Sequence, residues 1–213
     1  MPDNKQEMNI QWYPGHMTKT RRMIQSQLKN MDAVCEILDA RIPISSRNPD
    51  VEELTAGKPR LVVLNRIDIA DSDATRTWAA WFRSKGFAVL EVNAKDGQGT
   101  ARFAAAVREL LADKLAAYAE KGQVGRTVRV MIFGIPNVGK STFINKVAKR
   151  KTAKAEDRPG VTRTQQWVPV DRSLVLMDTP GMLWPKFDDP QVGLHLAFTG
   201  AVRDEILDTE TLA

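Results

Sequence analysis

The stretch Gly134-Ile-Pro-Asn-Val-Gly-Lys-Ser141 has the residue types and the spacing of a loop that holds phosphate groups. Gly134 and Gly139 allow backbone N–H groups to turn toward phosphate oxygens. Lys140 adds a positive charge at the outer phosphates, and the hydroxyl of Ser141 is a ligand for Mg²⁺. The alternative, a glycine-rich turn with a surface lysine, is opposed by the agreement of spacing and flanking elements. The residues expected to line the nucleotide are Ile135, Pro136, Asn137, Val138, Gly139, Lys140, Ser141 and Thr142.

Residues C-terminal to this loop suit the terminal phosphate and its metal ion. Asp178 ends an apolar run, where its carboxylate can hold Mg²⁺ through water, and Gly181 offers a backbone N–H to the γ-phosphate. Thr162 is the expected switch threonine that reaches Mg²⁺ when the triphosphate is bound. A plain turn hydroxyl is the alternative for Thr162, because several threonines lie nearby. The expected magnesium ligands are therefore Ser141, Thr162 and Asp178.

Recognition of the base is assigned to the tetrapeptide Asn65-Arg66-Ile67-Asp68, although a polar turn at a strand end is the alternative. The Asp68 carboxylate can accept hydrogen bonds from N1–H and the exocyclic amine of guanine. Adenine would leave that buried charge unpaired, which argues against a general ATPase. Arg66 stands where a lysine is usual, and its planar cation can stack on the base. The second guanine loop is Asn93-Ala94-Lys95, with the N–H of Ala94 or Lys95 directed at guanine O6.

The order of these motifs along the chain is unusual. In a Ras-like GTPase the phosphate loop comes first, whereas here the base-reading residues 65–68 precede the phosphate loop at 134–141. This order is typical of a circularly permuted GTPase, with the polar segment 120–127 as the connector between the former termini. Permutation need not disturb the site, because all the loops emerge from the carboxyl edge of one sheet.

Short β-branched runs alternate with helical periods, which predicts an α/β P-loop domain with a mostly parallel six-stranded sheet and helices on both faces. Helices are expected over Asp73–Lys85 and over 103–118. We interpret Trp78, Trp81 and Phe82 as core residues of the first helix rather than as nucleic-acid stacking residues. The expected strands are Val34–Leu38, Leu61–Leu64, Ala88–Val92, Val128–Phe133, Gln165–Val170 and Leu174–Met177.

Composition adds further limits. The chain has 213 residues, 43% of them apolar, which suffices for one domain with a full core. We expect a basic segment and helix at 1–32, the GTPase domain at 33–207 and a tail at 208–213. The single cysteine, Cys35, excludes an intrachain disulfide and is expected in the core. The apolar runs are too short to span a membrane and no signal sequence is visible, so we expect a cytoplasmic protein without a membrane partner.

Three further motifs carry a resemblance to a known family: Gln11–Met17, Asp39–Pro43 with Ser45–Pro49, and Gly181–Lys186. With the nucleotide motifs, they make residues 9–207 resemble the ribosome biogenesis GTPase A family of circularly permuted GTPases. The resemblance implies GTP as substrate and GDP as product, Mg²⁺, and late assembly of the large ribosomal subunit. It also implies binding to the immature subunit in the GTP state and release after hydrolysis. Members normally continue into a helical C-terminal domain, which is not seen before this sequence ends.

The residue that activates water is not among these loops. Met182 occupies the position after Gly181, where many GTPases have a glutamine, and a thioether cannot orient the attacking water. The resemblance points to His16, for which a surface or capping histidine is the alternative. It also points to Asn137 as a ligand for K⁺, unless this side chain bonds its own backbone. His195 has no motif around it and is expected on a helix surface. The residues assigned to catalysis are His16, Lys140, Thr162 and Gly181.

Basic residues outnumber acidic ones by 31 to 26, which favours an anionic partner. Two basic groups suit rRNA phosphates, although a solvated basic face explains them equally well. Arg41 and Arg47 are expected at the edge of the site, near the phosphates, unless Arg41 pairs with Asp39. The expected partners are the immature large subunit and its rRNA, without DNA, and the chain is expected to be a monomer. The basic groups are Lys19, Arg21, Arg22 and Lys29, and Lys146, Lys149, Arg150, Lys151, Lys154 and Arg158.

Two functions therefore remain open from the sequence. The first is a GTPase whose hydrolysis, stimulated by the ribosomal particle, times its release from a maturing large subunit. The second is a GTP-dependent RNA-binding placeholder with negligible hydrolysis. Met182 keeps the second open, because it cannot replace the usual glutamine.

Overall fold

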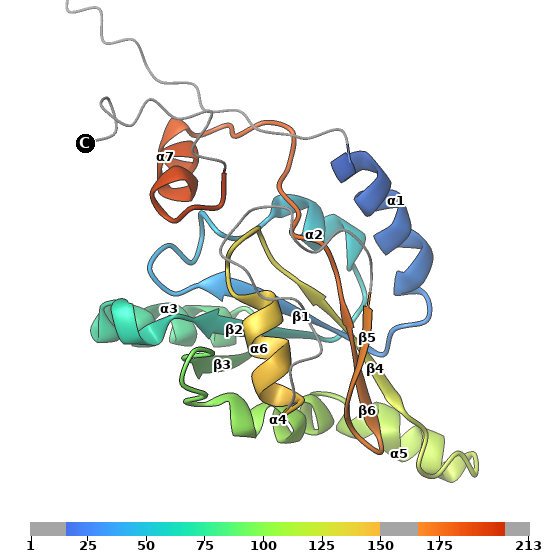
Figure 1. The fold of residues 1–213 in the computed structure, drawn as a ribbon. Helices are drawn as coiled ribbons and strands as arrows, with labels where there is room; N and C mark the ends of the chain where they lie inside the picture. The colour runs from blue at the N-terminus through green and yellow to red at the C-terminus, as the bar shows by residue number, and fades with distance from the viewer. Residues whose placement is uncertain (1–15, 150–165, 203–213) are drawn as a thin grey trace, which may run out of the picture.

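The computed structural model describes residues 16–149 and 166–202 (Figure 1). Six strands form one sheet in the order β3-β2-β1-β4-β6-β5, and every pair is parallel except β5 with β6. The predicted mostly parallel, six-stranded α/β sheet is thereby confirmed. The strands are β1 (Ala33–Asp39), β2 (Arg60–Asn65), β3 (Ala88–Val92), β4 (Val128–Phe133), β5 (Gln166–Asp171) and β6 (Leu174–Asp178).

The central strands are near-continuous apolar runs because both of their faces are covered. Every residue of β1 and β2 is buried. Strand β5 differs, since it lies at the edge of the sheet and only Val168 of its residues is buried. Pro169 has no N–H to donate to a ladder, and an edge strand tolerates it because one side of that strand needs no partner.

Helices pack on both faces of the sheet. On one face, Phe103 and Phe143 join Cys35 and Ile37 in the largest core cluster. The opposite face carries two smaller clusters, which contain residues of α1 and α2 and of α3. The helices are α1 (His16–Leu28), α2 (Pro49–Leu54), α3 (Ser72–Ser84), α4 (Phe103–Leu110), α5 (Ala112–Glu120), α6 (Lys140–Val147) and α7 (Pro190–Phe198).

Helix α1 contributes to the core. Its residues Ile24 and Leu28 are buried in a cluster that we call the α1 cluster. The domain limits expected at 32, 207 and 208 stay predictions. Cys35 is fully buried, which confirms the expected core thiol, and this burial raises its pKa. In the part of the chain that the structure describes, no helix is long and apolar enough to cross a membrane. The α1 cluster consists of Ile24, Leu28, Met31, Val34, Val51, Met131, Phe133, Met177 and Met182.

The prediction that all three aromatic residues of α3 are core was wrong for Trp81. The buried stripe of α3 is Thr75, Ala79 and Phe82, at spacings of four and three residues. Trp78 flanks this stripe and is half-buried, and Trp81 is 37% exposed. Ala79 and Phe82 pack on the sheet in one cluster, whereas Trp81 lies outside the buried stripe. Helical periodicity alone therefore assigns too wide a face to the core.

The single helix predicted over 103–118 was also wrong, because the structure has α4 and α5 with Leu111 between them. Leu111 is buried and adopts φ −105° and ψ 12°, outside the helical region. Its N–H still bonds the carbonyl oxygen of Val107, and its own carbonyl oxygen accepts the N–H of Leu115. The apolar spacing therefore continues across the break, which explains why the sequence pattern did not reveal it.

Candidate nucleotide-binding site

The predicted site loops lie at the carboxyl edge of the sheet, although they are far apart in sequence (Figure 1). Strand register brings Asn65 beside Asp39 and Val92, and Asp178 beside Ile132. Parallel strands end at the same edge, so the loops that follow them converge there. The altered motif order is thus compatible with one pocket, as expected for a permuted domain.

Asn65 joins three loops. Its side-chain Nδ2 donates a 2.8 Å hydrogen bond to the carbonyl oxygen of Val138 in the phosphate loop. Its Oδ1 accepts a 3.0 Å hydrogen bond from the N–H of Ala94 in the second guanine loop. A Cβ on Gly139, which has φ +96°, would lie 2.5 Å from the Asn65 Nδ2. Glycine is therefore required at 139 both by the backbone conformation and by the approach of Asn65.

Arg66 reaches the phosphate loop from the guanine loop. It adopts φ 67°, and its guanidinium donates to the carbonyl oxygen of Asn137. Its Nε also lies 3.7 Å from the carboxylate of Asp39, which Arg41 holds through two hydrogen bonds of 2.9 and 2.7 Å. The alternative that Arg41 pairs with Asp39 is confirmed. The stacking of Arg66 on a base stays a prediction, and Asp68 is exposed two residues farther along the chain.

The second guanine loop is preformed by its own hydrogen bonds. Asn93 donates from Nδ2 to Asp96 at 2.9 Å and accepts the Lys95 N–H at 3.0 Å. The two N–H groups expected at guanine O6, those of Ala94 and Lys95, are therefore both engaged within the protein in this structure. Lys146 of α6 also donates to the carbonyl oxygen of Asp96, at 3.3 Å.

Lys140 lies inside the phosphate loop. The residue is only 7% exposed, and its ammonium donates to the carbonyl oxygen of Ile135 at 3.1 Å. Burial lowers the pKa of Lys140 to about 8, and the Coulombic attraction of Asp178 opposes this shift only in part. Within the described residues this buried ammonium bonds one carbonyl oxygen, so it is suited to a further anionic partner.

Ser141 and Asp178 form an oxygen pair next to Lys140. The Ser141 hydroxyl donates to Asp178 Oδ2 at 3.5 Å. Among the described residues, the buried Oδ1 of Asp178 has no hydrogen-bond partner, and burial raises the pKa of this carboxyl group. An orphaned carboxylate oxygen beside a hydroxyl fits a hard cation such as Mg²⁺. Thr162, the third expected ligand, lies outside the described residues.

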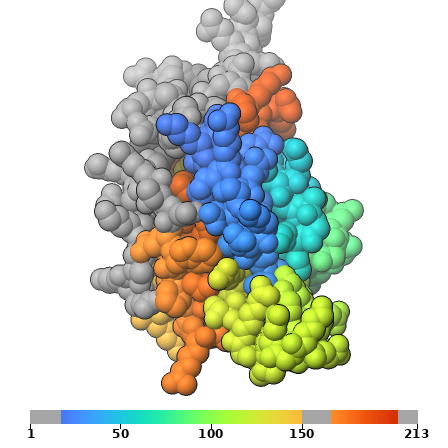
Figure 2. Space-filling view, turned by 90° about the vertical axis from the view of Figure 1, so that its right-hand side faces the viewer, coloured from blue at the N-terminus to red at the C-terminus, as the bar shows by residue number. Residues whose placement is uncertain are grey.

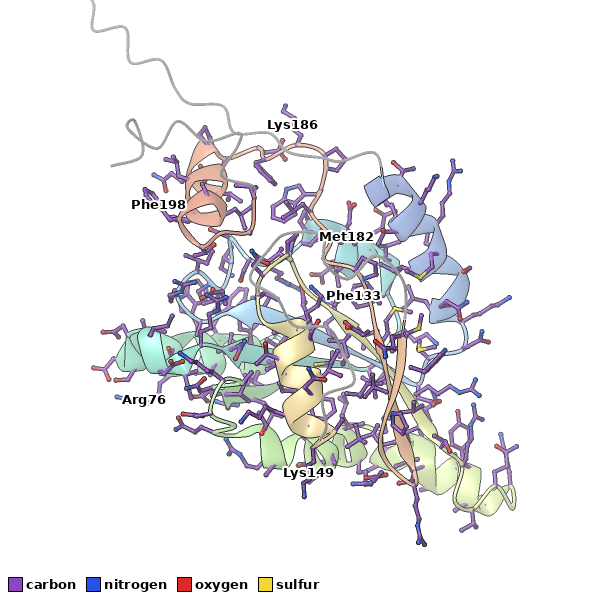
Figure 3. The ribbon with its side chains drawn as sticks, in the orientation of Figure 1. Arg76, Phe133, Lys149, Met182, Lys186 and Phe198 are labelled. Atoms are coloured by element: carbon purple, nitrogen blue, oxygen red, sulfur yellow. The ribbon has the colours of Figure 1, made fainter. Side chains whose placement is uncertain are left out.

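The segment after Asp178 lies against the phosphate loop. A Cβ on Gly181 would be 2.7 Å from Pro136 Cα, and the N–H of Met182 donates to the carbonyl oxygen of Gly134 at 3.2 Å. The side chain of Met182 is only 3% exposed and belongs to the α1 cluster with Phe133 (Figure 3). Met182 therefore points into the core and away from solvent.

His16 is the first residue of α1, and its side chain lies outside the described parts of the structure. The inner face of α1 packs in the same cluster as Met182. His195, in contrast, is exposed on α7, as expected for a helix-surface residue. Its Nδ1 forms a 2.8 Å hydrogen bond with Ser45 Oγ that the sequence did not indicate.

Two asparagine contacts tie the site to its surroundings and were missed from the sequence. Asn48 caps α2 and also donates from Nδ2 to the carbonyl oxygen of Met182 at 3.0 Å. Asn137 donates from Nδ2 to the carbonyl oxygen of Gly200 at 2.7 Å, so this amide nitrogen is not bonded to the asparagine's own backbone. The Asn-Pro pair at 48–49 is a signal for a helix start, but nothing in the sequence indicates the second contact of either amide.

The prediction that Arg47 lies near the phosphates was wrong. Its guanidinium lies 3.7 Å from the buried carboxylate of Glu36 and 5.2 Å from the ring centroid of Phe87. Arg60 approaches Glu36 from 3.6 Å as well. Burial raises the pKa of Glu36 to about 7. A buried carboxylate is stabilised by nearby cations, and Arg47 lies beside Glu36 rather than beside the phosphates.

Known proteins are similar to this chain over most of its length. The ribosome biogenesis GTPase A of Bacillus cereus is 52% identical over 206 residues, which are 97% of this chain and 70% of that protein. The chain belongs to the ribosome biogenesis GTPase A family. The mouse mitochondrial ribosome-associated GTPase 1 is 37% identical over 211 residues, covering 95% of this chain and 64% of that protein. A family described as 50S ribosome-binding GTPase matches residues 129–208.

Solved structures support the fold of this family member. GNP-bound YlqF from Thermotoga maritima has a TM-score of 0.64 and 26% identity, covering 91% of this chain and 71% of that one. The GDP-bound structure of the same protein has a TM-score of 0.63 and 27% identity. The circularly permuted GTPase fold predicted from the motif order is thereby confirmed.

Proposed function

We propose that this member of the ribosome biogenesis GTPase A family binds GTP with Mg²⁺ and hydrolyses it slowly alone and faster on an immature large ribosomal subunit, then leaves the particle. The observation that carries the nucleotide assignment is the position of Asn65. One side chain fixes the base-reading loop, the second guanine loop and the phosphate loop relative to one another. The names of the relatives support the ribosomal particle as partner.

Guanine specificity is assigned to Asp68. It follows β2 after Asn65 and is exposed, so its carboxylate is accessible to a ligand. Two hydrogen bonds from guanine to one carboxylate give strong discrimination, because adenine leaves the acceptor unpaired. Ala94 and Lys95 would border the base on the neighbouring loop. Arg66 would contribute by fixing the Asn137 backbone, in addition to any stacking.

Ser141 and Asp178 would hold Mg²⁺, with Thr162 as the third protein ligand. The bound ion supplies neutralisation of charge on the β- and γ-phosphate oxygens. The orphaned Oδ1 of Asp178 fits this assignment because it lacks a partner among the described residues. Lys140 would exchange its bond to the Ile135 carbonyl oxygen for bonds to phosphate oxygens, which satisfy a buried ammonium better.

The group that orients water must come from elsewhere than Met182, whose side chain is buried in the α1 cluster. We assign this role to His16, at the start of the helix that packs on that cluster. Asn137 would ligate K⁺ through its amide oxygen, since its nitrogen is already bonded to Gly200. A second cation would further neutralise the developing charge.

The alternative is a GTP-dependent placeholder with negligible hydrolysis, which the burial of Met182 favours. Multiple-turnover hydrolysis in K⁺ and in Na⁺, with and without precursor large subunits, separates the two. We expect slow turnover alone and clear stimulation by the particle in K⁺. No stimulation by particles that do bind the protein would establish the placeholder.

The same assay tests His16. His16→Ala should lose the stimulated rate while GTP affinity stays unchanged. His195→Ala is the matched control, because it removes an exposed histidine from α7. Full stimulation of the His16 variant would remove this residue from the mechanism, and equal rates in Na⁺ and K⁺ would remove the role of Asn137.

A further inference from the structure

An exposed patch of the sheet lies beside helix α1 and outside the nucleotide site. Strand register places Arg129 of β4 next to Val175 of β6, and Val175 next to Pro169 of β5. Trp167 lies two residues before Pro169 and opposite Met177. Arg129, Trp167 and Pro169 are exposed, and Trp167 shows 41% of its surface. A tryptophan this exposed on an edge strand leaves part of its ring accessible to a partner outside the domain.

Trp167 is paired with a cation. The guanidinium carbon of Arg129 lies 6.0 Å from the centroid of the Trp167 ring. Met177, opposite Trp167 on β6, belongs to the α1 cluster with Ile24 and Leu28, so α1 packs against the strand that neighbours Trp167. An exposed ring with a guanidinium beside it offers a base a surface for stacking and offers a phosphate a positive charge.

The outer side of α1 extends this positive charge. Lys19, Arg22 and Lys29 are exposed, and the helix sequence contains no acidic residue. Arg21 is not part of the group, because it pairs with Asp50 of α2 at 3.1 Å. Figure 2 shows α1 in blue, with the orange β5–β6 hairpin and the yellow-green α5 on the same side of the molecule.

Asp32, which is bonded to the backbone of Arg129, is already neutralised. Asp32 is buried, pairs with Lys114 at 3.0 Å and Arg126 at 3.9 Å, and accepts the backbone N–H of Arg129. These contacts lower its pKa despite the opposing effect of burial. Asp32 therefore does not offset the positive charge of Arg129 and of the outer side of α1.

We propose that this surface, formed by Lys19, Arg22, Lys29, Arg129 and Trp167 and called here the Trp167 face, binds unpaired RNA. One base stacks on the indole ring, and the basic side chains contact the backbone phosphates. The proposal rests on the proposed function in naming rRNA as the source of that RNA. A duplex keeps its bases stacked on each other and would use the charges without the ring. Addition of a peptide strand to β5 is disfavoured, because Pro169 removes an N–H from this edge.

Binding of fluorescently labelled RNA to the 213-residue chain tests the stacking. The probes are a short single-stranded oligoadenylate and an RNA duplex of equal length. Trp167→Leu should weaken single-strand binding about tenfold and leave duplex binding nearly unchanged, while Trp167→Tyr should retain most of the affinity. Trp81→Leu is the matched control, because Trp81 is similarly exposed, at 37%, but lies on α3 and outside the proposed RNA surface. Equal affinities for the wild type and Trp167→Leu would overturn the proposal, as would equal losses at 81 and 167.

The charge component has a separate readout. Arg129→Gln should reduce the slope of log affinity against log salt by about one, the value for a single phosphate contact. Arg76→Gln is its control, since Arg76 is exposed on α3 and pairs with Asp73 (Figure 3). An unchanged slope for Arg129→Gln would contradict its phosphate contact. GTP affinity of every variant checks folding, because neither Trp167 nor Arg129 belongs to the nucleotide site.

Co-sedimentation with precursor large subunits in the presence of a non-hydrolysable GTP analogue distinguishes this proposal from the proposed function. If the wild type binds oligoadenylate through Trp167 but no particle, the ribosomal function fails and RNA binding stands. If the wild type binds the particle and Trp167→Leu binds particle and RNA equally well, the Trp167 face fails alone. If Trp167→Leu loses the particle but keeps naked RNA, the face contacts a ribosomal protein, and the RNA proposal is overturned.

Discussion

The base-reading half and the phosphate half of the pocket differ in how far their polar groups are satisfied. In the base-reading half, Asn65 and Asn93 use both ends of their side-chain amides in hydrogen bonds within the protein. In the phosphate half, Lys140 bonds a carbonyl oxygen of its own loop, and Asp178 has a buried oxygen without a partner among the described residues. The first half is built by the protein, whereas the second is suited to completion by nucleotide and metal.

This difference implies that groups which hold the loops together and groups which wait for a ligand respond to substitution in opposite ways. Removing a group that holds loops together should cost stability even without ligand. Removing a buried charge that waits for a ligand should cost binding but not stability. Four predictions test this contrast.

Asp68→Asn should have the largest effect. The amide presents a donor where guanine also presents one, so we expect GTP affinity to fall about a thousandfold. Xanthine carries a carbonyl oxygen in place of the exocyclic amine, and the variant should prefer xanthosine triphosphate. Isothermal titration with both nucleotides measures the exchange. Because Asp68 is exposed, thermal stability should be unchanged. Asp71→Ala is not suitable as a control, because Asp71 caps α3. Tight GTP binding by the variant would remove Asp68 from base recognition.

Asn65→Ala should destabilise the protein without ligand. It leaves the Val138 carbonyl and the Ala94 N–H without their partner in a buried place, at a cost of about 3 kcal/mol. Urea denaturation of the nucleotide-free protein measures this loss. Asn30→Ala is the control, because Asn30 is exposed after α1. A loss confined to GTP affinity, with unchanged unfolding, would show that the base-reading half is not prebuilt.

Asp178→Asn should behave in the opposite way. Burial raises the pKa of this carboxyl group, so its ionised form is less favourable in the empty pocket than in water. Neutralising it removes a buried charge but also the Coulombic partner of Lys140, so the free energy of unfolding of the empty protein should change little. Mg²⁺ should then no longer tighten GTP binding, which titrations with and without the ion can show. A marked loss of stability in the empty variant would contradict the contrast between the two halves.

The sequence predicts the loops of the pocket but not the contacts that join distant segments around it. The loops of the pocket follow from motif spacing, because phosphate, magnesium and guanine each require particular groups at fixed distances. The bonds of Asn48 to Met182 and of Asn137 to Gly200 did not follow, since they join segments that only tertiary packing brings together. The exposure of Trp81 was missed for a similar reason, because a helical period does not show how wide the covered face is.

Glu36 is a further example of what a sequence pattern hides. It occupies a strand with apolar neighbours, and nothing nearby in the chain indicates that Arg47 and Arg60 will reach it. The sequence pattern therefore predicts Arg47 near the phosphates, although the structure uses it to compensate a buried carboxylate. A charge within a buried strand predicts a partner of opposite sign, but not which one.

The smallest expected effect concerns Lys140 and pH. Its pKa in the empty pocket is about 8, below the usual value because of burial, and bound phosphates would raise it. GTP therefore binds the protonated form, and above about pH 8 binding must take up a proton. From these fractions GTP affinity should fall about fourfold between about pH 7 and pH 8.5, while remaining nearly flat below pH 7. Titration calorimetry in two buffers of different ionisation enthalpy measures the proton uptake directly. If no proton is taken up at about pH 8.5, the ammonium is already satisfied in the empty loop, and the phosphate half would be as prebuilt as the half around Asn65.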